Sequence, residues 1–519
     1  MQIRNMKQVR IILFLFLVFP LIASAQTLDD KLKEIDDYAV RVLDTWKGPG
    51  MAIAIVKDDK TVFAKGYGVR ELGKPDKVDE NTIFEIASNT KAFTTAALAI
   101  LVDEKKIAWD DKVQKYLPDL QMYDPWVTNE LTIRDLVSHR VGLATFSGDL
   151  LWFNTTYSTD ELLRRARYLK PTSSFRTRYG YQNLMFVAAG KIVEKVSGKS
   201  WNDFVKERII DAVGMTRSKT RREELTDNVA RAHNTSGGTL RVLPLNDGAG
   251  YQAGYGAVGV NASVADLSRW IRLQLGRGTF EGKKIFSPAQ SWLMWQPNLM
   301  IPISENAARG NPTRHFYATG MGWFLYDYHG RKIINHSGGL DGMLSYTVLI
   351  PEENTGFVVL TNNEGPGFAI MMNKILDVMV DAPKRDFIAE ALARDEANKK
   401  AEADETAKVD ATRLANTKPS LALEGYTGTF TDQMYGDVTV AQENGKLVMR
   451  MIPTPSYVAD LEHWHLDTWQ IKWRPSVGYN FPRGFVTFTI DKNGKSEKLI
   501  IDQPNNDLWF YELDLKRKG

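Results

Sequence analysis

Apolar side chains recur at helical spacing directly after a serine and a lysine in the N-terminal part of the chain. Within and after the segment 84–93, the positions that would share one helix face are Phe93, Ala96, Ala97, Ile100 and Leu101. The pattern predicts that Ser88 lies at or near the start of this helix, where unpaired backbone N–H groups gather. Lys91 follows three residues later, so its amine is expected over the same helix face as the Ser88 hydroxyl.

Other stretches have patterns typical of an antiparallel sheet packed beside helices. Residues 29–45 have the spacing of an amphipathic helix, and 51–56 and 61–68 have that of two strands joined in a hairpin. Further helices are expected at 184–197 and 263–275, and further strands at 320–328, 333–335, 347–349 and 356–361. Helix, hairpin and helix in this order predict an α+β fold rather than a series of parallel strands with crossover helices.

The composition of the chain changes after Pro383. Residues 385–417 are rich in Ala, Glu, Lys and Asp, which is typical of a solvated linker helix. From Leu421 onward, short strands are expected at 426–430, 438–441, 446–451, 469–473, 485–490, 498–501 and 508–513. Hairpin turns at Asn444-Gly445 and Asn493-Gly494 join some of them. The pattern predicts a small antiparallel barrel or sandwich, filled by Trp464, Trp469, Trp473 and Trp509.

The first 25 residues have the pattern of a secretory signal peptide. Three basic residues precede the apolar stretch 11–22, and Ala23-Ser24-Ala25 provides a small-residue cleavage site. The alternative is an uncleaved membrane anchor, for which this apolar stretch is short. Since no other stretch is long and apolar enough to span a bilayer, we expect a secreted or periplasmic protein without a membrane span after cleavage.

Length and composition limit the remaining possibilities. A chain of 519 residues is expected to form two or three domains, and we predict a signal peptide at 1–25, a main domain at 26–384, a helical linker at 385–418 and a barrel domain at 419–519. The net charge of +3 comes from nearly balanced totals, so no nucleic-acid partner is indicated. The chain has no cysteine, which excludes disulfides, thiolate zinc sites and a cysteine nucleophile.

The chemistry that Ser88 and Lys91 could perform depends on partners elsewhere in the chain. A lysine one helical turn away can remove the proton of a serine hydroxyl, provided that burial or a nearby positive charge lowers its pKa. Taken alone, the pair is better explained by a helix N-cap serine followed by a solvated lysine. His139 is a candidate base by residue type, although its surroundings favour a structural histidine in a tight turn.

Two further patterns in the sequence do not indicate a binding site. Gly198-Lys199-Ser200 is not a phosphate-binding loop, because the upstream position that must be glycine is Val193. His463 and His465 alternate onto one face of a possible strand, and we favour a surface pair over a metal site. No metal and no other cofactor is therefore expected.

Two later stretches supply the partners that Ser88 needs. Tyr181 and Asn183 alternate onto one side of a loop just before a helix, and His336-Ser337-Gly338-Gly339 follows a strand. At this glycine pair a substrate backbone could approach closely, because glycine has no side chain in the way.

In this order, Ser88-x-x-Lys91, Tyr181-x-Asn183 and His336-Ser337-Gly338 resemble the serine β-lactamase and penicillin-binding-protein superfamily, on its class C and D-aminopeptidase/esterase side. The resemblance covers roughly residues 30–380, and further landmarks are 136–143, 320–323 and the helix around Asp266-Leu267. It implies an antiparallel sheet flanked by helices, with an all-helical subdomain beside it. The C-terminal barrel is similar to the lipocalin-like appendage of some D-aminopeptidases.

The resemblance also implies a role for each residue of the three motifs. Ser88 would be the acylated nucleophile, and Lys91 would take its proton. Tyr181 would relay a proton to the leaving group, with its hydroxyl held by Lys91, and Asn183 would hold the substrate amide or the lysine amine. The remaining substrate-binding residues would be His336, Ser337, Gly338 and Gly339, with the backbone N–H groups of Ser88 and Gly339 as the oxyanion hole.

One departure from the superfamily pattern affects the expected substrate. His336 stands where many β-lactamases have lysine, so a substrate carboxylate would be held less strongly near neutral pH. The resemblance therefore implies a serine hydrolase for small amides or esters, such as D-amino-acid-containing peptides. The alternatives are a β-lactamase or broad esterase of the same fold and a penicillin-binding or sensor protein without turnover. An oligomer is possible.

Overall fold

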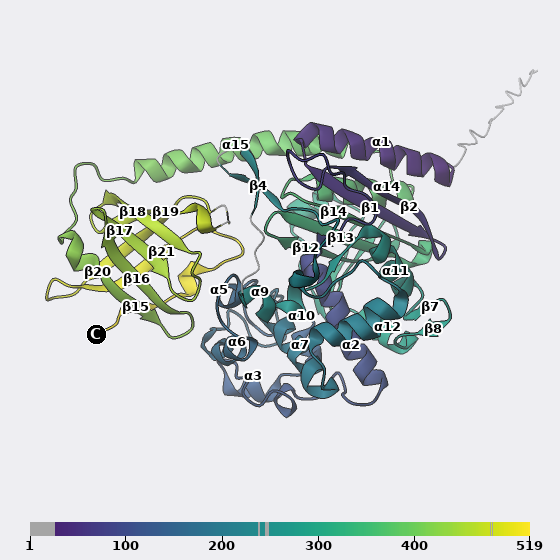
Figure 1. Cartoon of the computed structure of the whole chain (residues 1–519), viewed down its shortest axis with the longest axis horizontal. Coiled ribbons are helices and arrows are strands. Elements are labelled where there is room, and N and C mark those ends of the chain that lie inside the picture. Colours follow the sequence, from purple (N-terminus) through teal and green to yellow (C-terminus); the bar gives the residue numbers. More distant parts are fainter. Residues whose placement is uncertain (1–25, 237–238, 244–248, 478, 480) are drawn as a thin grey trace, which may run out of the picture.

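The computed structural model describes residues 26–236, 239–243, 249–477, 479 and 481–519, so the predicted signal peptide lies outside the described residues. Figure 1 shows two bodies, a larger one of sheet and helices and a smaller barrel, which the long helix α15 (Phe387–Ala411) connects. No helix of the described part is both long and apolar enough to cross a membrane.

The larger body is built on an eight-stranded antiparallel sheet in the order β2-β1-β14-β13-β12-β11-β10-β9. The strands, in chain order, are β1 (Gly50–Lys57), β2 (Lys60–Gly68), β9 (Leu299–Met300), β10 (Tyr317–Thr319), β11 (Phe324–Tyr328), β12 (Arg331–Leu340), β13 (Met343–Ile350) and β14 (Thr355–Thr361). The predicted hairpin of β1 and β2 is confirmed. The stretch expected as one strand at 320–328 is instead a turn followed by β11, with β10 before it.

Both faces of this sheet are covered, which explains why β1 is apolar at nearly every position. Ile53 and Ile55 belong to the core beneath α1 (Leu28–Trp46) and α14 (Gly367–Met379). Ala52 and Ala54, which point the other way, belong to the core shared with α2 (Thr90–Asp103) and α11 (Val264–Leu275). Successive strand residues therefore serve two cores.

Helices and short strands between β2 and β9 make up the rest of the larger body. The helices are α3 (Pro125–Glu130), α4 (Ile133–Leu136), α5 (Asp149–Trp152), α6 (Thr159–Arg165), α7 (Asn183–Ser197), α8 (Trp201–Val205), α9 (Ala249–Ala253), α10 (Tyr255–Val258) and α12 (Pro288–Met294), with α13 (Glu305–Gly310) after β9. The short strands are β3 (Phe84–Glu85), β4 (His233–Ser236), β5 (Thr239–Val242), β6 (Asn261–Ala262), β7 (Thr279–Phe280) and β8 (Lys283–Lys284). In Figure 1 the group around α2, α3, α6 and α7 lies below the sheet.

The C-terminal body is a closed barrel of eight antiparallel strands. They are β15 (Gly428–Asp432), β16 (Gly436–Glu443), β17 (Lys446–Met451), β18 (Val458–His465), β19 (Thr468–Trp473), β20 (Gly484–Ile490), β21 (Ser496–Asp502) and β22 (Leu515–Arg517). The strand expected at 508–513 was wrong, because that segment contains a 3-10 turn at Phe510–Glu512 and pairing resumes only with β22. Trp469 is buried in the barrel, whereas Trp473 and Trp509 are only partly buried.

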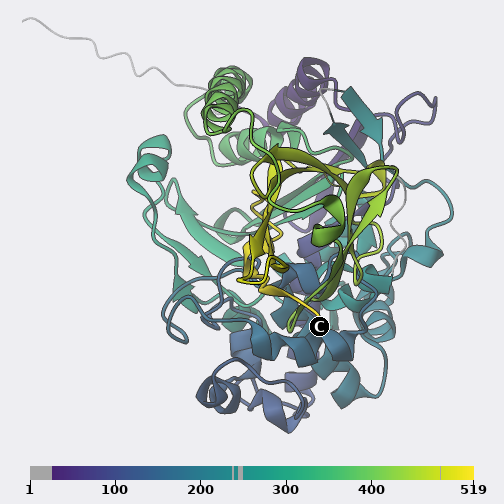
Figure 2. The ribbon, with the colours of Figure 1, turned by 90° about the vertical axis from the view of Figure 1, so that its left-hand side faces the viewer.

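The barrel is docked onto the segment that leads into α5 and α6. Glu512 accepts hydrogen bonds from the Ser147 hydroxyl (2.5 Å) and from the backbone N–H of Gly148 (3.0 Å). Tyr157 donates to the carbonyl of Tyr435 (2.6 Å), and Arg165 donates to that of Met434 (2.6 Å). Figure 2 shows the barrel in front of the larger body when the molecule is turned. These contacts fix one face of the barrel against the larger body.

Candidate active site

Ser88 lies in a 3-10 turn, Ala87–Asn89, that leads directly into α2. Ala87 has a φ of 46°, a left-handed conformation that costs a non-glycine residue roughly 1–2 kcal/mol. Hydrogen bonds hold the turn in place, because Asn89 donates to the Ser345 hydroxyl (2.7 Å), which donates to the carbonyl of Ile86 (2.7 Å). Ser88 is therefore presented from a turn that β13 fixes.

Lys91 is fully buried on the first turn of α2, directly behind Ser88. Its Nζ donates to the Ser88 hydroxyl oxygen (2.9 Å), to Asn183 Oδ1 (2.7 Å) and to the carbonyl of Ala257 (3.2 Å). Burial lowers the pKa of Lys91 to about 7, although the negative charge of Asp149 acts in the opposite direction. A substantial fraction of this amine is therefore unprotonated near neutral pH.

Asn183 connects Lys91 to a buried carboxyl group that the sequence did not indicate. Its Nδ2 donates to Asp149 Oδ2 (2.7 Å), while the indole Nε1 of Trp152 donates to Asp149 Oδ1 (2.9 Å). Burial raises the pKa of Asp149 to about 7, against the hydrogen bonds from Trp152 and Asn183. Because Asp149 Oδ2 takes the amide N–H, the amide oxygen of Asn183 is the atom that faces Lys91.

Tyr181 is buried beside Ser88 and is supported by an aromatic stack. Burial raises the pKa of its phenol well above the usual value, while a hydrogen bond with the Ser88 side chain lowers it. The Lys91 amine lies 4.8 Å from the centre of the Tyr181 ring and contacts the ring face. Its hydrogen bonds go to Ser88, Asn183 and Ala257, and the expected bond to the Tyr181 hydroxyl is not among them. The imidazole of His139 stacks on the same ring at 4.3 Å.

His139 occupies a tight turn, as expected of a structural histidine, with a φ of 56°. Its Nδ1 accepts the backbone N–H of Gln182 at 3.0 Å, which fixes the segment between Tyr181 and Asn183. Burial lowers the pKa of His139 well below its usual value, so the ring is neutral. Its position behind Tyr181 makes it a support for that ring.

The motif 336–339 lies on β12, in front of the Ser88 turn. The Nδ1 of His336 lies 2.6 Å from the carbonyl of Ser337; a carbonyl only accepts, so Nδ1 carries the proton and Nε2 is left as an acceptor. Burial, and to a smaller extent the positive charge of Lys91, lower the pKa of His336 to about 3. The imidazole is therefore neutral. Ser337 and Gly339 are exposed on the opposite side of the strand from His336 and Gly338.

Gly338 has a different role from the one expected for the glycine pair. A Cβ on Gly338 would lie 2.2 Å from the carbonyl oxygen of Ile86 and 2.9 Å from the backbone nitrogen of Ser88. What approaches Gly338 is thus the protein's own backbone. A Cβ on Gly339 would contact only a side-chain atom of Leu344, at 3.3 Å. Glycine at 338 allows β12 to pack against the Ser88 turn.

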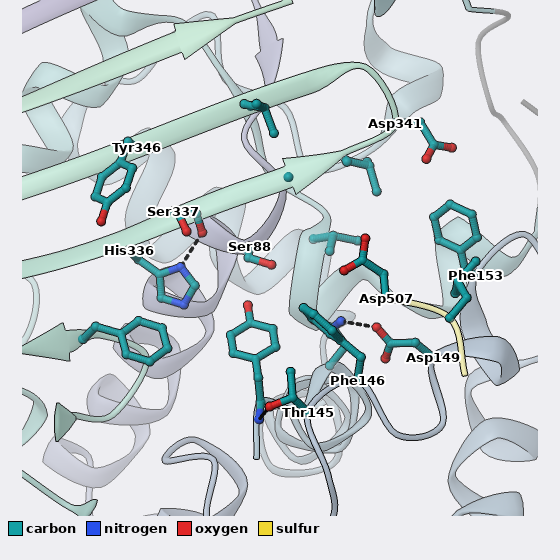
Figure 3. A pocket seen from close by; sticks show the side chains of 18 of the residues that line it. Ser88, Thr145, Phe146, Asp149, Phe153, His336, Ser337, Asp341, Tyr346 and Asp507 are labelled. Carbon is teal, nitrogen blue, oxygen red and sulfur yellow. Dashed lines mark hydrogen bonds between the residues drawn. The ribbon is translucent and has the colours of Figure 1, made fainter. Parts of the chain in front are cut away.

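These residues surround a cavity of about 700 Å³. The residues of the three motifs that form its walls are Ser88, Tyr181, Asn183, His336, Ser337 and Gly339. Two residues of the motifs do not line the cavity: Lys91 is buried behind Ser88, and Gly338 is buried in β12. Figure 3 shows the Ser88 hydroxyl between His336 and Asp507. Asp507 and two other lining residues, Tyr479 and Leu508, come from the barrel. The barrel therefore forms part of the cavity wall.

The structure brings together Ser88, Lys91, Tyr181, Asn183 and His336, which are far apart in the sequence. Sequence reasoning missed Asp149, because one acidic residue outside a motif carries no spacing signal. It also missed the barrel residues, because nothing in the pattern of short strands indicates which loop faces another domain. By contrast, His463 and His465 bond to different backbone groups, the carbonyl of Leu466 and the N–H of Leu414.

Comparison with known families agrees with this arrangement. The family described as Beta-lactamase matches residues 35–377. The chain belongs to the β-lactamase family. A second match, to a domain of unknown function (DUF3471), covers residues 412–517 and so spans the barrel.

Relatives of this β-lactamase-family protein carry different names. It is 28% identical to the unguisins hydrolase ungD' of Aspergillus campestris over 443 residues, which is 80% of this chain and 78% of that protein. It is 30% identical to penicillin-binding protein 4 of Amycolatopsis lactamdurans over 326 residues, 60% of this chain and 81% of that protein. The octameric penicillin-binding protein homologue from Pyrococcus abyssi shares the fold, with a TM-score of 0.62 and 21% identity over 94% of this chain and 100% of the other.

Proposed function

We propose that this protein is a serine hydrolase that forms an acyl-enzyme on Ser88 and hydrolyses small amides or esters, with D-amino-acid-containing peptides as the favoured class. The observation that carries the proposal is the 2.9 Å hydrogen bond between the buried Lys91 amine and the Ser88 hydroxyl. A lysine with a pKa of about 7 can accept the serine proton, which an ordinary lysine cannot do near neutral pH.

In the acylation step, Ser88 Oγ attacks the substrate carbonyl carbon and its proton passes to Lys91. The backbone N–H groups of Ser88 and Gly339 would bind the oxyanion, and one such donor is worth roughly a hundredfold to a thousandfold in rate. The leaving group departs with a proton delivered through Tyr181, which bonds to Ser88. Water then attacks the acyl carbon, gives up a proton to the same groups and releases Ser88.

A β-lactamase is the second candidate, because the family carries that name and one relative is named a penicillin-binding protein. The neutral His336 argues against efficient β-lactam hydrolysis, since a substrate carboxylate finds no cation at that position. The relatives named unguisins hydrolase support hydrolysis as the general activity.

The decisive experiment compares wild-type protein with Ser88→Ala on nitrocefin, a p-nitrophenyl ester and a D-aminoacyl p-nitroanilide. We expect Ser88-dependent turnover of the ester and the anilide, and much slower turnover of nitrocefin. Mass spectrometry after mixing with a slow ester should show one acyl group on Ser88, and only in wild type. Turnover that survives in a folded Ser88→Ala protein would refute the assignment, and an acyl adduct that is never released would favour a sensor.

We also propose export, because the pattern at 1–25 is that of a cleavable signal peptide. N-terminal sequencing of the protein secreted by its host should begin at Gln26. An oligomer is a further proposal, supported by the octameric state in the name of the Pyrococcus abyssi homologue. Light scattering of the purified protein measures it directly.

A further inference from the structure

The cavity beside Ser88 has two ends, which the register of β12 defines. Ser88 packs against Gly338, since a Cβ on Gly338 would lie 2.9 Å from the Ser88 backbone nitrogen. The part of β12 before Gly338 leads toward Tyr346, which pairs with Ser337, whereas the part after it leads to Asp341. Figure 3 shows Tyr346 on one side of Ser88 and Asp341 on the other. A substrate whose scissile bond lies at Ser88 can therefore place its acyl group at one end and its leaving group at the other.

Tyr181 indicates which end receives the leaving group. In the proposed mechanism the leaving atom takes its proton through Tyr181, so this atom must come within hydrogen-bond reach of the phenol. The Tyr181 ring lies 6.3 Å from the ring of Phe324, nearly parallel to it, and 6.2 Å from the imidazole of His336. Phe324 pairs with Asn335, so both neighbours of Tyr181 belong to the same end of the cavity as Tyr346.

The free nitrogen of His336 supports the same direction. Because Nδ1 bonds to the carbonyl of Ser337 and carries the proton, Nε2 is a hydrogen-bond acceptor. This Nε2 atom is buried and has no partner among the described residues. In a peptide, the N–H next to the scissile carbonyl belongs to the leaving nitrogen, since the neighbour on the acyl side is a carbon atom. His336 can therefore accept the N–H of a leaving amine.

Four aromatic rings from different elements line this end of the cavity. They are Tyr179 before α7, Tyr317 on β10, Phe324 on β11 and Tyr346 on β13, and together they are called the aromatic pocket. The ring of Phe324 contacts those of Tyr317 and Tyr179, with centroids 5.7 Å and 6.0 Å apart. A ring inserted among them can make the edge-to-face and offset contacts that aromatic pairs prefer.

Hydrogen bonds hold part of the aromatic pocket in place before a ligand binds. The Tyr346 hydroxyl donates to Asn335 Oδ1 at 3.1 Å, and Asn335 Nδ2 donates to the carbonyl of Phe324 at 3.2 Å. Two of the four rings are thus tied to one another through Asn335. A preformed pocket loses less conformational entropy on binding than one that has to be assembled.

The charges at this end favour a neutral ligand over a cation. Burial raises the pKa of the Tyr179, Tyr317 and Tyr346 phenols, so they are uncharged at pH 7. The guanidinium of Arg314 lies 4.0 Å from the ring centre of Tyr326, and its positive charge acts against the effect of burial on Tyr317 and Tyr346. A leaving group with an ammonium ion would be repelled by this cation, whereas a neutral ring would not.

We propose that the aromatic pocket binds the leaving group and selects substrates whose leaving group carries a neutral aromatic ring. The inference rests on the proposed hydrolase function and specifies the leaving-group side of its substrate class. Ser88 Oγ forms the new bond to the acyl carbon while the bond from that carbon to the leaving oxygen or nitrogen breaks. The leaving atom receives the proton through Tyr181, and a neutral aromatic alcohol or amine departs from the aromatic pocket.

The test compares three esters with one acyl group: 2-phenylethyl, 2-cyclohexylethyl and n-butyl acetate. The acyl-enzyme is the same for all three and their alcohols are similar in acidity, so differences in kcat/KM arise from leaving-group binding. We expect kcat/KM for the 2-phenylethyl ester to be about tenfold above that of the butyl ester and about threefold above that of the cyclohexyl ester. A 2-phenylethyl ester that is no faster than either comparison ester overturns the inference.

Single substitutions locate the preference in the aromatic pocket. Tyr317→Leu and Tyr179→Leu each remove one ring but keep an apolar side chain, and each should reduce the ratio of phenylethyl to butyl ester by about twofold to tenfold, the range for one aromatic pair. The matched control is Tyr123→Leu, which replaces a tyrosine that is 53% exposed and lies outside the cavity lining, and it should leave the ratio unchanged. An unchanged ratio in both folded pocket variants overturns the inference.

The activated ester p-nitrophenyl acetate separates this inference from the proposed function. If it is hydrolysed through Ser88 but the three alkyl esters react at equal rates, the leaving-group preference is wrong and the hydrolase assignment stands. If its hydrolysis does not depend on Ser88, the hydrolase assignment fails. When none of the alkyl esters is turned over, protection of Ser88 from a fluorophosphonate probe replaces kcat/KM: 2-phenylethanol should protect better than 2-cyclohexylethanol, and equal protection overturns the inference.

Discussion

Asn183 donates a hydrogen bond from Nδ2 to Asp149 Oδ2 at 2.7 Å, and its amide oxygen lies 2.7 Å from the Lys91 amine. The carboxylate can accept the amide N–H but the amide oxygen cannot bond to it, so Asp149 determines which atom Lys91 meets. The same carboxylate lies within reach of the lysine charge and raises the lysine pKa. Asp149 thus affects both the orientation of Asn183 and the protonation of Lys91.

Replacing Asp149 with Asn should reduce kcat/KM for a neutral ester by about tenfold, because the Asn183 amide loses its fixed orientation and a near-attack geometry is lost. Removal of the negative charge should also shift the midpoint of the pH–rate profile to lower pH, since the carboxylate favours the charged lysine. Stopped-flow acylation measured from pH 5 to 9 checks both effects. Activity within twofold of wild type and an unmoved midpoint would contradict this role.

For the wild-type protein, acylation should accelerate as pH rises and level off above a midpoint near 7. Only the unprotonated Lys91 can take the serine proton, and its pKa is about 7. Asp149 titrates in the same range, so the midpoint belongs to the pair. His336 should not contribute, because its pKa of about 3 keeps it neutral throughout. A midpoint near 10 in the pH profile of ester hydrolysis would show that the pKa of Lys91 is not lowered.

Gly338→Ala should destabilise the protein by about 1–3 kcal/mol and strongly reduce acylation, because the new methyl group collides with the carbonyl of Ile86 and displaces the Ser88 turn. The neighbouring Gly339→Ala is the matched control for stability, since its methyl group would meet only one side-chain atom of Leu344. Urea unfolding of both variants measures the difference. Equal unfolding midpoints would show that β12 accommodates a methyl group at position 338 without loss of stability.

Removing Glu512 should loosen the barrel. Glu512→Ala leaves the buried Ser147 hydroxyl and the Gly148 N–H without their acceptor, which costs about 1–3 kcal/mol. We expect faster proteolysis between the two bodies. Glu497→Ala, an exposed site on β21, serves as the control. If the two variants are cleaved at the same rate, these contacts do not hold the barrel in place.

The sequence predicted the fold class, the hairpin of β1 and β2 and the start of α2, because these follow from local spacing and turn residues. It also predicted the linker helix, which runs from Phe387 to Ala411 with an exposed surface after its first turns. The family resemblance named the residues that the structure gathers around Ser88. Each of those residues belongs to a motif, and motifs are what one sequence can reveal.

What could not be predicted depends on contacts between distant segments. Asp149 is significant only because α5 places it beside Asn183, and Asp507 only because the barrel docks against the Ser147–Gly148 segment. The sequence predicts that a substrate backbone approaches Gly338, whereas the backbone of Ile86 and Ser88 lies there. A strand pattern does not show which neighbour packs against a glycine. The 508–513 stretch has the composition of a strand, but it contains a 3-10 turn from which Glu512 accepts a hydrogen bond from Ser147 of the larger body.

The straight connector α15 also places a constraint on evolutionary change. In the first half of the helix, Asp395 accepts a hydrogen bond from Trp46. Just beyond the end of the helix, Arg413 donates to the carbonyl of Trp464 and the backbone N–H of Leu414 donates to His465. With both ends anchored, each inserted or deleted residue would rotate the barrel by about 100° and shift it by about 1.5 Å. Even seven residues, which restore the rotation, would shift the barrel by about 10 Å and separate Glu512 from Ser147 and Gly148, so the length of this helix should tolerate little change.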